Sequence, residues 1–514
     1  MSTAAAGKAT NTQIIAKNSV WYGAEIACSI FGSFITSVVV ARMMGPQRLG
    51  YFQYVVWLTN MTTAVGSFGL PMTTRKYMAE CLNRGEEPVA RAIYGVALRI
   101  QLLIAAAVTL ISLGLVFWAG DPVYRVCSVL LVLNMAPRIV GLIPSQANNA
   151  AELMKRSTPP ALIGSFFNLV LTFAALAAGW GLIGLAAAAL IGSTIESVLK
   201  LVDVRRRLAP VPVGRLDPDL KKRMFSYSGQ GLVLMILNVA VWDRSDLVIL
   251  RFLNPDVRQL AFFSTAFNLT ERVLMIPSAF GYTLGTTMMA QYGRARDRLV
   301  HLTVAGAKYA LLVALPLLAG MACVSAPIVK LLYGQQYLPI IPVLSVAAAL
   351  AIPKALNNSA YLFLQTTENQ GFLIWVGCIG GALDIALDFL LIPHYGALGA
   401  ALANGTAQTF AAIAVWYRAY RLLGVGLPLG EFGRVFLSGF LMVAATLATQ
   451  WALGGYLGLG CSIVLGGIVW CAALRGTSAL THADGDRLRG IGSALPGRVR
   501  PLYLRFVGLL APAA

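Results

Sequence analysis

The chain has 514 residues, of which 58% are hydrophobic and only 12% are charged, and its mean hydropathy is +0.72. A soluble domain of this size needs more charged residues to cover its surface, so the composition excludes a soluble protein and indicates an integral membrane protein. The net charge of +19 would point to nucleic acid in a soluble chain. In a membrane protein it is expected from basic cytoplasmic loops.

Apolar runs of spanning length follow one another along the chain, separated by short polar, Pro-rich or Arg-rich breaks. A bilayer core about 30 Å thick needs roughly 20 apolar residues per helical span. The first run is much longer than the apolar core of a signal peptide, so we expect an uncleaved first span. We predict an all-α polytopic membrane protein with about fourteen transmembrane helices, at residues 18–43, 51–73, 92–119, 122–145, 160–179, 181–202, 226–252, 260–288, 302–326, 338–363, 371–392, 396–420, 431–453 and 455–474.

Basic residues concentrate in alternate loops. Most of the Lys and Arg between the spans lie at 74–91, 155–156, 203–224 and 294–298, and the tail at 487–505 is also basic. The positive-inside rule places such segments in the cytoplasm. We therefore predict an even number of spans with both termini in the cytoplasm. This asymmetry accounts for most of the net charge without any binding of nucleic acid.

Two pairs of similar segments indicate an internal repeat. Residues 39–46 resemble 248–255, and residues 181–187 resemble 396–402. Six predicted spans lie between equivalent segments, and an even number gives parallel repeats with the substrate path at their interface. The predicted domains are an N-terminal six-helix lobe at 1–203, a basic linker at 204–224, a C-terminal six-helix lobe at 225–425, two extra transmembrane helices at 426–475 and a cytoplasmic tail at 476–514.

Ionisable residues within the spans are candidates for function because charge is costly in lipid. The cations suit an anionic group such as phosphate, which Arg binds bidentately. They are Arg99, Arg138, Arg244, Arg272 and Lys354. The carboxylates either pair with these cations or titrate with transported ions, and they are Glu25, Asp243, Asp246, Glu271, Asp384 and Asp388.

Helical spacing gathers some of these charges on one face of a span. Gly377, Gly381, Asp384 and Asp388 share a face of the predicted span at 371–392. Such a polar face must contact protein or water. It lines a transport path or, alternatively, forms a helix contact made by small and polar residues.

Enzyme motifs are missing from the sequence. It has no GxxxxGK[ST] loop for ATP, and no HExxH or GxSxG motif. The three His and seven Cys form no cluster with metal-ligand spacing. We therefore expect a transporter that is not an enzyme and holds neither metal nor cofactor. The energy source expected is an H⁺ or Na⁺ gradient or the membrane potential.

Several segments resemble the polysaccharide transporter family, the Wzx-type oligosaccharide flippases of the MATE-like MOP superfamily. They are residues 41–45 with Tyr51 and Phe52, residues 331–337 and residues 392–401. The resemblance implies two six-helix bundles with two further helices in the inner (cytoplasmic) membrane of a bacterium. It also implies translocation of undecaprenyl-diphosphate-linked oligosaccharides for exopolysaccharide or O-antigen synthesis, by alternating access of a cationic cavity.

The same resemblance suggests partners and a limit on the substrate. The expected partners are the lipid-linked oligosaccharide, membrane lipids, and the polysaccharide polymerase and export machinery. Lipid II flippases carry cavity arginines in the first span, but this chain has no Arg between Trp21 and Val40. That departure argues against a peptidoglycan precursor as the substrate.

Two other functions compete with the flippase. A MATE-like cation or drug antiporter usually has twelve spans and an anionic lobe without neighbouring cations. A membrane glycan polymerase or ligase needs a sizeable outer loop with catalytic groups, and every predicted outer loop is short. The favoured hypothesis therefore places the diphosphate of a lipid-linked oligosaccharide against Arg99, Arg138, Arg272 and Lys354.

Overall fold

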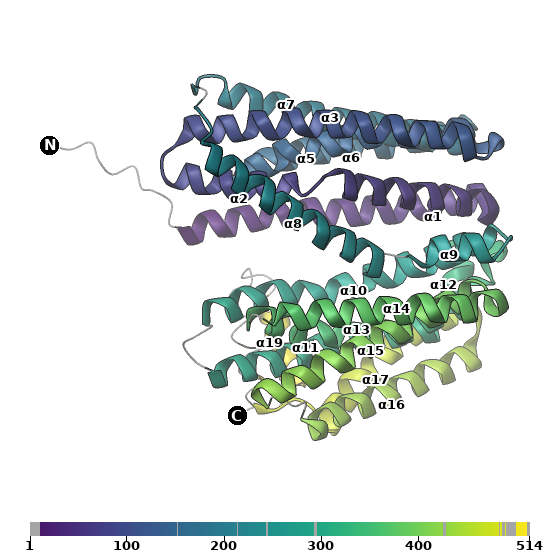
Figure 1. Ribbon diagram of the computed structural model, residues 1–514. Helices are drawn as coiled ribbons and strands as arrows, with labels where there is room; N and C mark the ends of the chain where they lie inside the picture. Colours follow the sequence, from purple (N-terminus) through teal and green to yellow (C-terminus); the bar gives the residue numbers. More distant parts are fainter. Residues whose placement is uncertain are drawn as a thin grey trace. The chain divides into compact units, whose positions relative to one another are not determined.

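The computed structural model describes residues 11–151, 153–212, 214–242, 245–291, 296–367, 369–424, 428–482, 484–485, 489 and 500–510. Every element in these ranges is a helix (Figure 1). The chain divides into two compact units, Met1–Asp243 and Arg244–Ala514.

The first unit is a bundle of helices. It contains α1 (Asn11–Gly66), α2 (Leu70–Asn83), α3 (Glu87–Ala119), the short 3-10 helix η1 (Pro122–Tyr124), α4 (Arg125–Leu133), α5 (Met135–Ala150), α6 (Met154–Ala177), α7 (Gly181–Leu208) and α8 (Pro218–Trp242). Very close contacts hold α6 against α7. A Cβ on Gly192 would lie 2.8 Å from the carbonyl oxygen of Gly164. Small residues thus let two backbones approach closely, as in other membrane helix pairs.

The second unit is also a helical bundle. It contains α9 (Asp246–Leu253), α10 (Arg258–Gln291), α11 (Arg296–Cys323), α12 (Ser325–Leu332), the 3-10 helix η2 (Gln335–Tyr337), α13 (Ile340–Thr366), α14 (Gln370–Tyr395), α15 (Ala397–Leu423), α16 (Leu429–Leu453), α17 (Gly455–Gly476) and α19 (Arg500–Leu510). In this unit α13 packs against α10, α11 and α15, and α14 packs against α9 and α15. These two sets of contacts position the polar residues described below.

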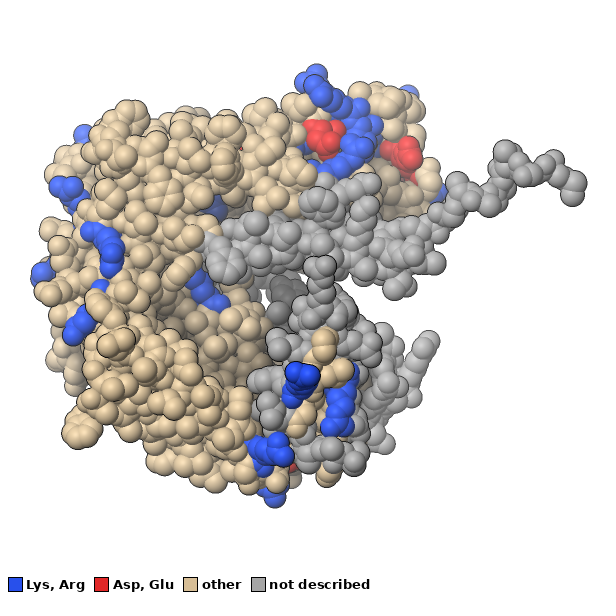
Figure 2. All heavy atoms as spheres, turned by 180° about the vertical axis from the view of Figure 1, so that it is seen from behind, with Lys and Arg blue, Asp and Glu red and all other residues tan. Residues whose placement is uncertain are grey.

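Ten helices among the described residues are long and apolar enough to cross a membrane. Each lies within a few residues of a predicted span, from Glu87–Trp118 to Gly455–Gly476. The other four predicted spans fall on the two arms of α1, on α8 with α9, and on α10. Large apolar side chains such as Trp118 and Trp451 are exposed, and Figure 2 shows few charged residues on most of the described surface in that view. The chain is therefore a multi-pass, all-α membrane protein.

The repeated segments occupy similar places in the two units. The first breaks α1 at Gly45, which has a φ of 71° and is followed by Pro46. Its counterpart, Asn254 with Pro255, lies in the loop between α9 and α10. The second pair supplies the glycines at the starts of α7 and α15, Gly181 and Gly396, both with positive φ. In both repeats, therefore, the similar segments mark where the chain leaves one helix for the next.

Candidate functional site

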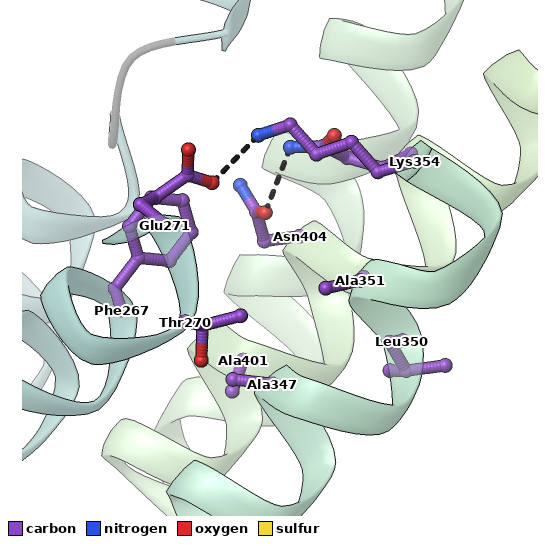
Figure 3. A pocket seen from close by; sticks show the side chains of 11 residues that line it. Phe267, Thr270, Glu271, Ala347, Leu350, Ala351, Lys354, Ala401 and Asn404 are labelled. Atoms are coloured by element: carbon purple, nitrogen blue, oxygen red, sulfur yellow. Dashed lines mark hydrogen bonds and ion pairs between the residues drawn. The ribbon is translucent and has the colours of Figure 1, made fainter. Parts of the chain in front are cut away.

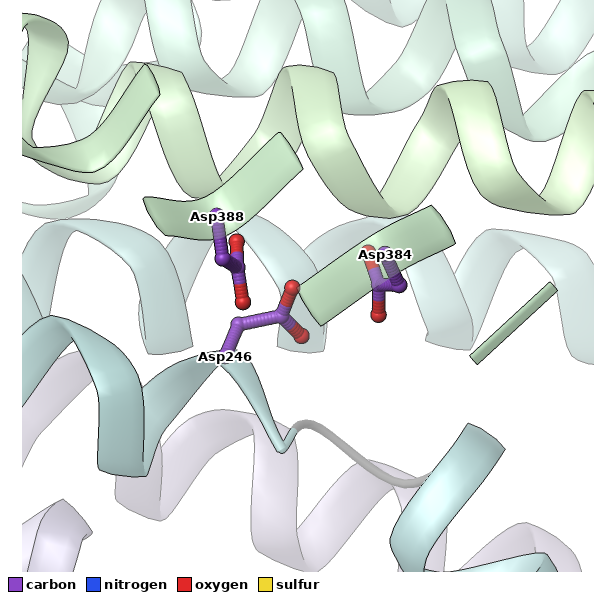
Figure 4. A group of neighbouring side chains, drawn as sticks. All are labelled: Asp246, Asp384 and Asp388. Carbon is purple, nitrogen blue, oxygen red and sulfur yellow. The ribbon is translucent and has the colours of Figure 1, made fainter. Parts of the chain in front are cut away.

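Three aspartates from two helices meet inside the second unit (Figure 4). Asp246 is the first residue of α9, and Asp384 and Asp388 lie one turn apart on α14. One carboxylate oxygen of each lies within 4.8 Å of the others. Their exposed fractions are 0%, 3% and 0%. The shared face of the predicted span at 371–392 is thus buried against α9, and its glycines Gly377 and Gly381 are buried with it.

The cluster has few polar partners. Asn404 on α15 donates from Nδ2 to Asp246 Oδ2 at 3.2 Å. Four other carboxylate oxygens, Asp246 Oδ1, Asp384 Oδ1 and both oxygens of Asp388, are buried without a hydrogen-bond partner among the described residues. No Lys or Arg in that part of the chain forms an ion pair with the three aspartates.

Three buried carboxylates cannot all carry charge at this separation without compensation. A proton or a bound cation supplies it. Carboxylate and amide oxygens are the ligands that hard cations take, and each aspartate brings a carboxylate oxygen within 4.8 Å of the other two. The donor set therefore fits a small cation and provides no soft ligand for a transition metal.

A pocket lies next to the cluster and is lined by α10, α13 and α15 (Figure 3). Glu271 on α10 and Lys354 on α13 extend toward each other, and their Oε1 and Nζ atoms are 2.7 Å apart. Both side chains are 35% exposed, so the pair is only partly buried. Phe267, Asn404 and Gln408 also line the pocket, and Lys354 Nζ lies 5.7 Å from the centre of the Phe267 ring.

Hydrogen bonds between side chains connect the pocket to the cluster. Gln408 Nε2 donates to Asn404 Oδ1 at 3.1 Å, and Asn404 in turn donates to Asp246. A group in the pocket can thus contact both amide side chains, and Asn404 connects them to the carboxylate of Asp246.

The other predicted site residues have different outcomes. Arg272 is half-buried on α10, directly after Glu271, and is not a member of the Glu271–Lys354 ion pair. In the first unit Arg99 is exposed on α3, and Arg138 on α5 donates to Asn60 Oδ1 on α1. The remaining three candidates lie outside the described residues or side chains: Glu25, Asp243 and Arg244. The structure thus joins three of the predicted carboxylates in one cluster and pairs a fourth with Lys354.

Sequence reasoning missed Asn404 and Gln408. Asn404 begins an Asn-x-Thr triplet within a predicted span, and its spacing to Gln408 is one helical turn. Two amides on one face of an apolar helix are a signal that could have been used. It also missed two ionic contacts within spans, the Glu196–Lys200 pair on α7 and the contacts of Lys308 on α11.

Comparison with solved structures gives the class of protein. The lipid II flippase MurJ in an inward closed conformation aligns with a TM-score of 0.70 at 16% identity, covering 89% of this chain and 97% of that one. An inward-facing MATE multidrug transporter of the MOP superfamily aligns at 0.65 and 13% identity, covering 77% and 94%. A MOP superfamily transporter from Pyrococcus furiosus aligns at 0.60 and 13% identity, covering 81% and 99%. The chain therefore has the fold of the MOP superfamily, as the sequence predicted.

Comparison with protein families is more specific. Residues 39–342, more than half of the chain, match a family described as "Polysaccharide biosynthesis protein". The chain belongs to this family. No curated protein sequence matches it.

Proposed function

We propose that this protein is a flippase that moves lipid-linked oligosaccharides across a bacterial inner membrane, for exopolysaccharide or O-antigen synthesis. Membership of a polysaccharide biosynthesis family supports a glycan as the cargo. The MOP fold, which the lipid II flippase shares, supports movement of a lipid-linked molecule across a bilayer. The positive-inside pattern supports cytoplasmic termini.

The observation that carries the transport proposal is the buried cluster of Asp246, Asp384 and Asp388. An ion-coupled transporter needs a site within the membrane that takes and releases a cation, and three buried carboxylates suit that role. We assign this cluster to H⁺ or Na⁺. Movement of the ion down its gradient then supplies energy for the transport cycle.

Cations at Arg99, Arg138, Arg272 and Lys354 are proposed to receive the diphosphate of the substrate. Arg forks match phosphate oxygens, and Lys acts as a point charge. Lys354 has the clearest role because it lines a pocket and is already paired with Glu271. A diphosphate there would compete with Glu271 for the ammonium group. The polymerase and export machinery are proposed as partners that take the glycan after translocation.

The test is a flipping assay in proteoliposomes that contain a fluorescent polyprenyl-diphosphate oligosaccharide. A membrane-impermeant glycosidase reports the substrate in the outer leaflet. We expect rapid exposure with the wild-type protein under an imposed H⁺ or Na⁺ gradient, and loss of the gradient dependence in Asp388→Asn. A rate equal to that of protein-free liposomes would refute the flippase. Efflux of cationic drugs in its place would indicate the MATE-like antiporter.

A further inference from the structure

Two amide side chains on α15 connect the aspartate cluster to the Glu271–Lys354 pocket. Asn404 and Gln408 lie one turn apart, both line the pocket, and they are only 7% and 8% exposed. The hydrogen bonds run in one direction, from Gln408 Nε2 to Asn404 Oδ1 and from Asn404 Nδ2 to Asp246 Oδ2. The two amides therefore form a single chain from the pocket to the cluster.

A side-chain amide donates from its nitrogen and accepts at its oxygen, so its orientation determines which of these two groups each neighbour meets. Asp246 here accepts from Asn404, which places the oxygen of Asn404 toward Gln408. The nitrogen of Gln408 is then engaged. Its Oε1 accepts no hydrogen bond from the described residues and is the amide atom left for the pocket that Gln408 lines.

A cation in the cluster reverses this requirement. A metal cation takes oxygen ligands, and a protonated Asp246 becomes a donor that needs an acceptor. In both cases Asn404 is better placed with Oδ1 toward the cluster. Its amide protons then need an acceptor, which Gln408 supplies when it turns Oε1 toward Asn404. That turn directs the amide nitrogen of Gln408 into the pocket.

We propose that Asn404 and Gln408 form a relay of two amides that reverses when the cluster takes a cation. The pocket beside Lys354 then changes from presenting a carbonyl oxygen to presenting N–H donors, which suit the oxygens of an anionic group such as phosphate. The relay rests on the proposed function and gives the sign of the coupling between cation binding in the cluster and substrate binding in the pocket. Cation binding favours an anionic group in the pocket, and by reciprocity an anionic group there tightens cation binding.

Through Gln408, the relay lets the charges of the pocket change the affinity of the cluster for a cation. Lys354 stabilises the orientation in which Gln408 presents oxygen, which is the orientation of the empty cluster. Removing this charge with Lys354→Met should tighten cation binding. Removing its partner with Glu271→Gln leaves Lys354 uncompensated and should weaken cation binding. Each shift should be about fivefold or more, the usual size of a coupling between sites.

The experiment measures both shifts with and without the relay. Purified full-length protein in nanodiscs is titrated with Na⁺ as the probe cation, and affinity is taken from the rise in thermal unfolding temperature. Lys354→Met and Glu271→Gln are each made in the wild-type and in the Gln408→Met background. Methionine keeps the bulk of glutamine but has no amide. We expect both shifts to shrink to within about twofold in that background, the limit of ordinary additivity.

The outcomes separate the relay from its alternatives. Direct charge–charge interaction gives the same signs but does not need Gln408, so shifts that persist in Gln408→Met overturn the relay and leave the flippase standing. A wild-type protein that Na⁺ does not stabilise overturns both the Na⁺ relay and Na⁺ coupling. Gln408→Leu provides a second amide-free variant if Gln408→Met does not fold. Thr409→Val is the matched control, because among the described residues the Thr409 hydroxyl bonds only to Gly405 O on its own helix, so its loss should change neither shift.

Discussion

Lys308 on α11 and Asp484, which follows α17, form an ion pair with Nζ and Oδ2 2.6 Å apart, although 176 residues separate them in the sequence. Lys308 also reaches Glu431 Oε2 on α16 at 2.6 Å. Asp484 accepts further hydrogen bonds from Tyr309 and from Thr481. The segment after α17 is thereby attached to α11, a helix distant in sequence, and Lys308 joins that helix to α16.

Asp484→Asn should lower the stability of the second unit by about 3 kcal/mol, because breaking a buried pair leaves an uncompensated charge and Glu431 compensates only part of it. Burial alone would raise the pKa of Asp484, but the bonds from Lys308, Thr481 and Tyr309 outweigh it and lower the pKa to about 2. Because the pKa of Asp484 is lower in the folded protein than its unfolded value near 4, the charged carboxylate stabilises the fold above about pH 4. This contribution is lost as the pH falls toward 2.

The measurement is the thermal unfolding temperature of wild-type and variant protein across that pH range. The wild type should be more stable at neutral pH, and the two curves should converge between pH 4 and pH 2. Asp219→Asn, at an exposed position in the first turn of α8, is the control and should follow the wild type throughout. Curves that stay parallel would contradict the assignment.

Asp388→Asn should raise stability and reduce transport. Both oxygens of Asp388 are buried without a partner among the described residues, so removing one negative charge relieves repulsion within the cluster. The same change removes a ligand of the proposed ion. We expect a higher unfolding temperature in ion-free buffer and a loss of about tenfold or more in gradient-driven flipping.

The matched control is Asp256→Asn, which removes a more exposed carboxylate paired with Arg258. It should leave transport near the wild-type rate, because such surface pairs contribute about 1 kcal/mol or less. A destabilised Asp388→Asn that transports normally would show that the cluster is structural.

Arg138→Gln should abolish glycan export, and Arg138→Lys should weaken it, because Lys keeps the charge but loses the guanidinium fork. Arg138 is exposed and donates to Asn60 Oδ1, so its side chain is held between α1 and α5. Export is measured in cells after confirming membrane insertion. Arg156→Gln, which breaks a surface pair with Asp203, should export normally. Normal export by Arg138→Gln would remove Arg138 from the proposed diphosphate site.

Topology is tested with reporter fusions. Fusions after Arg84, Lys222 and Arg489 should report the cytoplasm, and fusions near Asp121 and Tyr337 should report the opposite side, because Lys and Arg concentrate on the former set of segments. An outside signal from the 203–224 linker would exclude the predicted orientation.

The fold was readable from the sequence because bilayer thickness imposes a length on every apolar helix. Ten described helices match predicted spans for this reason. The break between the first two spans was also readable, since Gly45 tolerates the positive φ of the break and Pro46 disfavours a continuous helix.

The site was only partly readable. Helical spacing placed Asp384 and Asp388 on one face, but no local pattern says that α9 brings Asp246 to that face. Pairing between Lys354 and Glu271 depends on the packing of α10 against α13, which spacing along one helix does not specify. Asn404 gains its importance from Asp246, a contact across 158 residues.

The turn at Gly396 has a consequence for the register of the aspartates. Gln259 Oε1 near the start of α10 accepts a hydrogen bond from the Ala397 amide at the start of α15. A Cβ on Gly396 would lie 3.2 Å from Asn254 Nδ2, so the residue that follows α14 packs closely against the residue that follows α9. Asp246 and Asp388 each lie eight residues before these end points, Asn254 and Gly396. Inserting one residue between Asp246 and Asn254 would turn Asp246 by about 100° around its helix and carry its carboxylate out of the cluster. The length of this short helix is therefore as much a part of the cluster as the carboxylates themselves.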